Sequence, residues 1–296
     1  MEDHKKANLF VVGAMRAGTT SFAAVLSEHP DIYVSPIKEP HYFLPKLPKA
    51  VYSPSRFFSL TDYFRKDFPK ELHIADVNTL AQYKKLFSLT GHQKYLAEAS
   101  TCYLSAPNVA EAIKTYNPEA RIIVLVREPL ARAYSHYAMD VALGREQHSF
   151  EIAMQKELTL LEKGELPWYS RIGMSCYDSA IANYQRHFST VCIIELEHLI
   201  KNPKETFKKV ADFLEIDLFP DLTFPKKNEA VHMRNSSIVY FLSNLGVRDQ
   251  ISNVLGTRAK KAILKVSSTN KPNGHKLSDS TKERLLAVFQ KHSTGY

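Results

Sequence analysis

The sequence FVVGAMRAGTTSF (residues 10–22) joins an apolar strand, a loop of small residues and the start of a helix. Such a unit points loop amides and a helix N-terminus at one place, where they can bind phosphate. The stretch has the frame of a phosphate-binding P-loop, Gly-x-x-x-x-Gly-Lys-[Ser/Thr], but Thr19 stands in place of the lysine and Arg16 is the loop's only cation. The frame alone leaves two possibilities open: a phosphate site, or an ordinary connection in which Thr20 or Ser21 caps the helix.

The rest of the chain alternates short apolar runs with helical patterns. Strands are expected at residues 9–12, 73–75, 95–97, 121–126 and 191–195. Helices are expected at residues 20–28, 56–68, 106–116, 130–143, 150–163, 175–187, 203–214 and 280–292, with a polar loop at 267–275. Alternation of apolar strands with helices favours a parallel sheet covered on both faces. We therefore predict an α/β fold, a P-loop-like three-layer sandwich with a central parallel sheet flanked by helices, formed by one domain over residues 1–296.

Composition and charge restrict the class of protein. The 296 residues are 44% apolar, and the formal charge of +8 suits a polyanionic partner. The positive charge is spread along the chain, so we expect no nucleic-acid partner. No apolar run reaches the roughly 18 residues of a transmembrane helix, and the polar start does not resemble a signal peptide. We therefore expect no stable membrane anchor and a cytoplasmic location. No pattern predicts an oligomeric state.

The three cysteines, Cys102, Cys176 and Cys192, are odd in number and widely spaced. Their spacing matches neither a disulfide framework nor a zinc site, so we expect reduced thiols and no bound metal.

A second basic site follows the predicted strand at residues 121–126. Arg127 comes directly after this strand, and ligands bind at the carboxyl ends of parallel strands. Pro129 can begin the next helix, which places Ser135 about two turns into it, facing the ligand if Arg127 does. The alternative is that Arg127 pairs with Glu128 or another surface acid while Ser135 only packs.

A third loop, SPIKEPHYF (residues 35–43), follows the first predicted helix. It holds Lys38, Glu39 and His41 between prolines and aromatic residues. Apolar neighbours would raise the pKa of Glu39 and help it act as a base near neutral pH. The alternative is a surface pair of Lys38 and Glu39 beside a packed histidine.

Together, the three loops resemble the PAPS-dependent sulfotransferases (PAPS is 3′-phosphoadenosine 5′-phosphosulfate), most closely the branch of the heparan sulfate sulfotransferases and their bacterial relatives. The family's 5′-phosphosulfate loop, roughly [Lys/Arg]-x-Gly-Thr-[Thr/x], is matched by residues 16–21, with arginine where lysine is usual. Its 3′-phosphate signature, a strand-ending arginine and a serine eight residues later, is matched by Arg127 and Ser135. The Lys-Glu-x-x-[Phe/Tyr]-Phe of the glycan-acting branch is matched by residues 38–43. Weaker echoes lie at residues 98–103, 173–188 and 195–214.

The resemblance implies a metal-free transfer of the sulfuryl group of PAPS, in line, to a hydroxyl (less readily an amine) of a glycan, glycolipid or small molecule, leaving PAP (adenosine 3′,5′-bisphosphate). Glu39 would be the general base, and His41 would orient the acceptor or act as the fallback base. Lys38 would position the acceptor or the leaving group. Arg16 would neutralise charge at the bridging oxygen as the S–O bond breaks.

The resemblance also implies a set of donor-binding residues. Residues expected to bind the donor are Arg16, Ala17, Gly18, Thr19, Thr20, Ser21, Arg127, Ser135, Lys271 and Lys276. The last two occupy the place of the family's basic nucleotide-covering loop but match it least well. The acceptor is expected to be chosen by residues 42–68 and by the region of Trp168 and Tyr169.

Two other classes of function remain as alternatives. A P-loop kinase or NTPase needs the missing lysine at the β- and γ-phosphates, and Thr19 cannot replace it. The third class is a non-catalytic nucleotide- or glycan-binding protein. The presence of Glu39, Arg16 and Arg127 together argues against a loss of activity.

Overall fold

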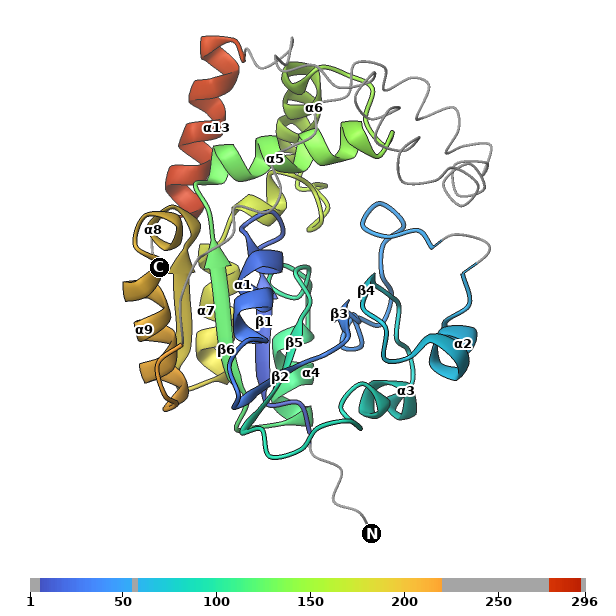
Figure 1. The fold of residues 1–296 in the computed structure, drawn as a ribbon. Coiled ribbons are helices and arrows are strands. Elements are labelled where there is room, and N and C mark those ends of the chain that lie inside the picture. Colours follow the sequence, from blue (N-terminus) through green and yellow to red (C-terminus); the bar gives the residue numbers. More distant parts are fainter. Residues whose placement is uncertain (1–5, 55–57, 220–276, 294–296) are drawn as a thin grey trace, which may run out of the picture.

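The computed structural model describes residues 6–54, 58–219 and 277–293 (Figure 1). Five parallel strands form the central sheet, in the order β2-β5-β1-β6-β7. They are β1 (Leu9–Gly13), β2 (Ile32–Val34), β5 (Tyr95–Ala99), β6 (Arg121–Val126) and β7 (Val191–Glu195). β1 lies at the centre because Leu9 pairs with Ala97 on one side and with Arg121 on the other. The carboxyl ends of β5, β1 and β6 therefore meet at one edge.

Helices cover both faces of the sheet, which confirms the predicted three-layer α/β sandwich. They include α1 (Thr19–Leu26), α4 (Val109–Tyr116), α5 (Pro129–Ala142), α6 (Phe150–Glu162), α7 (Asp178–His187), α9 (Pro203–Leu214) and α13 (Asp279–His292). In Figure 1, α1 lies in front of the sheet and α4 and α7 lie behind it. α13 packs on α5 and α6, over a second, smaller apolar cluster. None of the described helices is long and apolar enough to cross a membrane.

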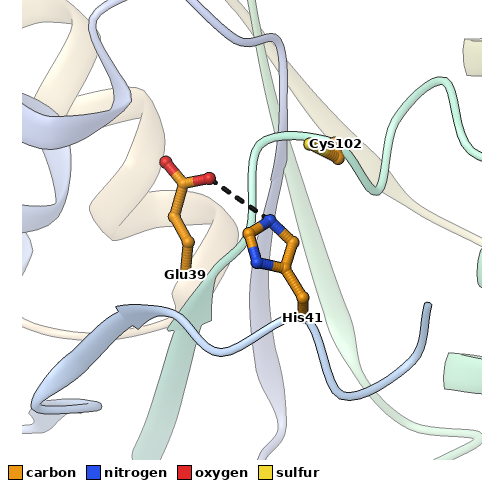
Figure 2. Close-up of side chains that lie close together, drawn as sticks. All are labelled: Glu39, His41 and Cys102. Atoms are coloured by element: carbon orange, nitrogen blue, oxygen red, sulfur yellow. Dashed lines mark ion pairs between the residues drawn. The ribbon is translucent and has the colours of Figure 1, made fainter. Parts of the chain in front are cut away.

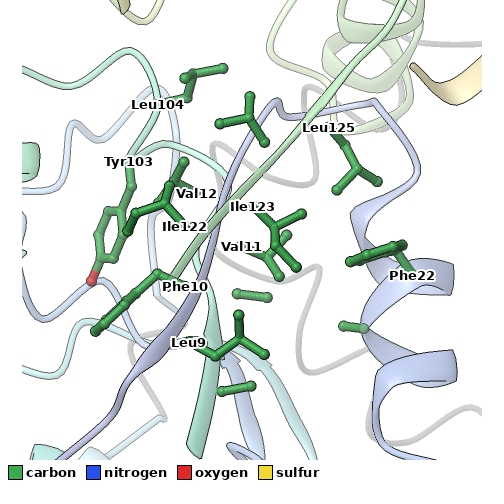
Figure 3. Packing of buried hydrophobic residues seen from close by; sticks show 14 of the residues in the cluster. Leu9, Phe10, Val11, Val12, Phe22, Tyr103, Leu104, Ile122, Ile123 and Leu125 are labelled. Carbon is green, nitrogen blue, oxygen red and sulfur yellow. The ribbon is translucent and has the colours of Figure 1, made fainter. Parts of the chain in front are cut away.

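The core is built from the apolar strands that the sequence marked. All five residues of β1 and all five of β5 are buried. Side chains alternate along β1, so that Val11 lies toward Phe22 of α1 while Phe10 lies toward Tyr103 on the other face (Figure 3). A central strand buried on both faces needs such a continuous apolar run.

One strand prediction was wrong in its placement. The run predicted at residues 73–75 forms β4 (Leu72–Ile74), which pairs with β3 (Ile37–Glu39) in a separate two-stranded parallel sheet. β4 is only partly buried, so it lacks the burial on both faces that a central strand requires. The fifth strand of the central sheet is instead β2, which has only three residues and was not predicted.

Most predicted helices are present, with shifted ends. The helix predicted at 56–68 is shorter, and Arg56 lies outside the described residues. Its described part is a turn of α2 (Leu60–Asp62), capped by the side chain of Ser59, followed by a π-helical turn (Tyr63–Asp67). A 3₁₀ turn (Gly173–Ser175) precedes α7. Two helices of six residues, α3 (Leu80–Lys85) and α8 (Leu196–Lys201), were not predicted. The predicted loop at 267–275 lies outside the described residues, and the single-domain extent stays a prediction.

Candidate active site

The loop between β1 and α1 presents backbone N–H groups at the carboxyl edge of the sheet. α1 follows Gly18, and within the described residues no side chain caps it, so the predicted alternative of a capped connection is not found. The amides of Thr19, Thr20 and Ser21 have no partner inside the helix because they form its first turn. This is the arrangement that binds phosphate groups.

Gly18 gives this loop its shape. Its φ is 84°, in the left-handed region that favours glycine. A Cβ at this position would lie 2.6 Å from Cδ1 of Leu196, at the start of α8. Ala17 beside it is fully buried. Leu196, which follows β7, therefore packs directly against the loop at Gly18.

The structure brings Arg16, Arg127 and Ser135 together. Nε of Arg16 donates a hydrogen bond of 3.0 Å to Oγ of Ser135, and Nη1 of Arg127 donates one of 3.3 Å to the carbonyl of Arg16. Burial and the neighbouring Arg127 lower the pKa of Arg16, while Asp140 acts in the opposite direction. Two guanidinium groups thus lie close to each other beside the N-terminus of α1, where they favour an anion.

The acid pairings left open for Arg127 are resolved by the geometry. Glu128 does not pair with it but caps α5, where its carboxylate accepts from the amides of Leu130 and Ala131. Among the described residues, the acid that pairs with Arg127 is Glu197, whose Oε1 lies 4.0 Å from Nε of Arg127. A pair at that distance, with Glu197 half exposed, neutralises little of its charge.

A buried arginine that the sequence analysis missed holds the same loop in place. Arg132 is fully buried, and its Nη1 donates to the carbonyl of Met15 at 3.2 Å. Its Nε and Nη2 donate at 2.6 Å to Oγ of Ser175 and to the carbonyl of Arg171. The only available signal was a charged residue on the buried face of α5, three residues before Ser135.

At the end of β3, Lys38, Glu39 and His41 also lie together, and Figure 2 shows the pair of Glu39 and His41. Nζ of Lys38 lies 2.9 Å from Oε1 of Glu39. Nε2 of His41 lies 3.4 Å from Oε2, and the hydroxyl of Thr101 donates to Oε2 at 2.9 Å. Glu39 is 7% exposed, so the predicted alternative of a Lys–Glu surface pair is wrong.

The expected rise of the Glu39 pKa is also wrong. Burial does act to raise it, but the charge of Lys38 and the contacts with His41 outweigh burial and hold the pKa well below its usual range. Burial lowers the pKa of His41, and its contacts with Cys102 and Glu39 reverse this and raise it. The pair is therefore a carboxylate beside an imidazolium at neutral pH.

A buried polar network lies beneath this pair. The amide of His41 donates to Oγ of Ser100 at 3.2 Å, and Ser100 donates to Oε1 of Glu98 at 2.7 Å. Oε2 of Glu98 accepts from the hydroxyl of Tyr83. Burial raises the pKa of Glu98. The family echo at residues 98–103 therefore supports the loop that carries His41.

The segment after β5 connects the two halves of the site. The hydroxyl of Thr101 contacts Glu39, and its carbonyl oxygen lies 2.9 Å from the position of a Cβ on Gly13. The same segment brings Cys102 to the base, because the ligand atoms of Glu39, His41 and Cys102 lie within 4.8 Å of one another (Figure 2). Residue spacing along the chain did not predict this cluster.

The remaining predicted residues are placed as follows. Trp168 and Tyr169 contact each other, with ring centroids 5.4 Å apart, and pack beside the main core. Residues 42–68 are described except for 55–57. Lys271 and Lys276 lie outside the described residues.

A family model described as "Sulfotransferase family" matches residues 8–221. Among curated proteins, the membrane-associated sulfotransferase kil1 of Dictyostelium discoideum is 28% identical over 52% of this chain and 29% of its own length. Carbohydrate sulfotransferase 15 of Mus musculus is 24% identical over 71% of this chain and 44% of its own. Heparan sulfate glucosamine 3-O-sulfotransferase 3B1 of Homo sapiens is 23% identical over 69% of this chain and 45% of its own length. The chain thus spans less than half the length of these relatives.

Among the solved structures that match this chain, two illustrate the similarity in fold. A sulfotransferase from Alicyclobacillus acidocaldarius is 25% identical with a TM-score of 0.59, covering 87% of this chain and 99% of its own. Mouse sulfotransferase SULT7A1 complexed with PAP is 16% identical with a TM-score of 0.51, covering 98% of this chain and 85% of its own. At this identity the likeness shows the fold alone.

Proposed function

Because this chain belongs to the sulfotransferase family, we propose that it transfers the sulfuryl group of PAPS to a hydroxyl of a glycan, glycolipid or small molecule. The observation that carries the proposal is the meeting of two arginines, one serine and a helix N-terminus at the carboxyl edge of the central sheet. The ionised Glu39, at the end of β3, is joined to this edge by the hydroxyl of Thr101, which follows β5. The similarity to carbohydrate and heparan sulfate sulfotransferases supports a sugar hydroxyl as acceptor. An amine is the less favoured acceptor.

For the donor, we assign the amides of Gly18, Thr19 and Thr20 to the 5′-phosphate, together with the N-terminus of α1. Arg127 and Ser135 would bind the 3′-phosphate, where the planar guanidinium can contact two oxygens. Membership of the sulfotransferase family supports the choice of donor. Since Arg16 contacts Ser135 at 3.0 Å, we propose that it releases this hydroxyl and turns to the bridging oxygen when PAPS binds.

For the chemical step, the acceptor oxygen forms a bond to sulfur while the S–O bond to the 5′-phosphate breaks. The proton of the acceptor hydroxyl passes to Glu39, and the electron pair of the broken bond stays on PAP, beside Arg16. A lowered pKa makes Glu39 a weak base. We propose that Lys38 leaves Oε1 for the acceptor or the leaving group, which raises the basicity of Glu39 when it is needed. The transfer itself needs no metal in this scheme.

The test is a thermal-shift panel of PAP, PAPS, ATP and GTP, each with and without Mg²⁺, followed by transfer of radiolabelled sulfate from PAPS to desulfated heparan and chondroitin chains. We expect metal-independent stabilisation by PAP and PAPS and label in the glycan. Stabilisation by ATP or GTP only with Mg²⁺ would favour the kinase class. Stabilisation by PAP without transfer to any acceptor would favour a binding protein. The cytoplasmic location and the absence of a nucleic-acid partner stay predictions.

A further inference from the structure

The cluster of Glu39, His41 and Cys102 contains a buried imidazole nitrogen that makes an ion pair but no hydrogen bond to the described residues. Nε2 of His41 is fully buried and has no hydrogen-bond partner among the described residues. It lies 3.4 Å from Oε2 of Glu39, in the range of an ion pair but without hydrogen-bond geometry. A buried nitrogen without a hydrogen bond is costly, and among the described residues the ion pair with Glu39 is what offsets that cost.

The donor set and its spacing match a borderline divalent cation. Carboxylate oxygen, imidazole nitrogen and thiolate sulfur are all ligands of Zn²⁺. Tetrahedral Zn²⁺ with bonds of about 2.1 Å to oxygen and nitrogen holds those two atoms about 3.4 Å apart. Oε2 of Glu39 and Nε2 of His41 already have that separation. Glu39, His41 and Cys102 each place one ligand atom within 4.8 Å of the other two.

We propose that Glu39, His41 and Cys102 bind Zn²⁺, and that bound Zn²⁺ blocks sulfuryl transfer by occupying the carboxylate. The binding step is balanced by release of the thiol proton of Cys102 and the imidazolium proton of His41. The effect on activity rests on the proposed function, whereas the site itself does not.

Lys38 and a metal ion would compete for the carboxylate of Glu39. Its ammonium group lies 2.9 Å from Oε1 and competes with any cation for the same carboxylate. Oε2, which faces His41 and Thr101, is the oxygen left for the metal. We expect a cation that enters to displace the ammonium group of Lys38, whose side chain is 14% exposed.

The experiment is a titration of the metal-free full chain with Co²⁺, followed by displacement with Zn²⁺. We expect a thiolate-to-cobalt charge-transfer band that saturates at one equivalent. It should vanish in Cys102→Ser and persist in Cys192→Ser, a matched control because Cys192 is also buried. Lys38→Met should bind Zn²⁺ at least tenfold more tightly than the natural chain.

Several outcomes would overturn the site: no charge-transfer band, a band that persists in Cys102→Ser, or an unchanged affinity in Lys38→Met. Circular dichroism identifies a Cys102→Ser chain that fails to fold, in which case His41→Gln is the second variant and must weaken Zn²⁺ binding. No donor or acceptor is present in this titration, so its failure leaves sulfuryl transfer standing. If the band is present but Zn²⁺ does not slow transfer, the inhibitory role is wrong.

Discussion

At the loop between β1 and α1, two guanidinium groups and a helix N-terminus lie together, whereas at the end of β3 one carboxylate is enclosed by an ammonium group, an imidazole and a hydroxyl. The first region has an excess of positive charge and favours an anionic ligand. The second region is already compensated by its own residues. The residues at the loop between β1 and α1 therefore already have the charge that an anionic donor needs. Glu39 must first lose its contact with Lys38 before it can accept a proton.

The largest expected effect separates chemistry from binding. Glu39→Gln removes the proton acceptor but keeps the size of the side chain, so we expect activity to fall by about 10²–10⁴-fold while PAP affinity changes little. Radiolabelled transfer and calorimetry with PAP measure the two quantities. Glu71→Gln, a change of an exposed acid just before β4, is the control and should keep full activity. Full activity in Glu39→Gln would contradict the base assignment.

A second variant tests the charge at the donor end. Arg16→Ala should lower kcat by about 10²–10³-fold, because a single positioned donor at developing charge contributes about 3 kcal/mol. Arg16→Lys keeps the charge and should recover most of the rate. Steady-state kinetics with varied PAPS separates kcat from KM. A change confined to KM would show that Arg16 acts only in ground-state binding.

A third variant asks which phosphate Arg127 contacts. Arg127→Ala should weaken PAP by about 10–100-fold, since hydrogen bonds to charged groups contribute about 1.5–3 kcal/mol, and should weaken adenosine 5′-monophosphate much less. Arg121→Ala, at the opposite end of the same strand β6, is the matched control. Equal losses for both nucleotides would mean that Arg127 does not contact the 3′-phosphate.

A fourth pair of variants measures the packing of the donor loop. Gly18→Ala places a Cβ against Leu196 in a left-handed backbone, so it should lower the melting temperature and weaken PAP binding. Gly164→Ala carries a similar backbone cost of about 1–2 kcal/mol, since its φ is 71°, but its Cβ meets nothing within 4 Å. The difference between the two variants isolates the contact with Leu196. Identical losses would contradict a tight fit there.

The smallest effect concerns acid stability. The pKa of Glu39 is lowered in the folded state, so its ionised form stabilises the fold above the unfolded pKa of about 4.3, and this stabilisation is lost as pH falls. The difference in unfolding free energy between the natural chain and Glu39→Gln should therefore shrink between about pH 5 and pH 3. Urea unfolding at a series of pH values measures it. A difference that grows on acidification would contradict the lowered pKa.

The sequence predicted the three layers of the fold because continuous apolar runs such as β1 and β6 indicate strands that are buried on both faces. It was insufficient for β2, which has three residues and no periodicity to detect. It also misassigned β4 to the central sheet, since strand partners depend on contacts distant in the chain. The helices α3 and α8 are similarly too short for a helical repeat.

For the site, local motifs identified the residue groups but not their electrostatics. The prolines and aromatic residues around Glu39 suggested desolvation, which is present, yet its lowered pKa depends on how closely Lys38 and His41 approach the carboxylate. Cys102 reaches the same place from the loop after β5, more than sixty residues away in the chain. Only the folded arrangement of the strands brings these groups together.

The walls of the donor loop limit how far it can be moved to another protein. The space beside Gly13 is taken by Leu104 and that beside Gly18 by Leu196, and Arg132 binds the carbonyl of Met15. Residues 10–22 grafted onto a different strand and helix would keep the sequence of the motif but lose the contacts that hold its backbone conformation. The portable unit is the loop together with three neighbours from distant parts of the chain.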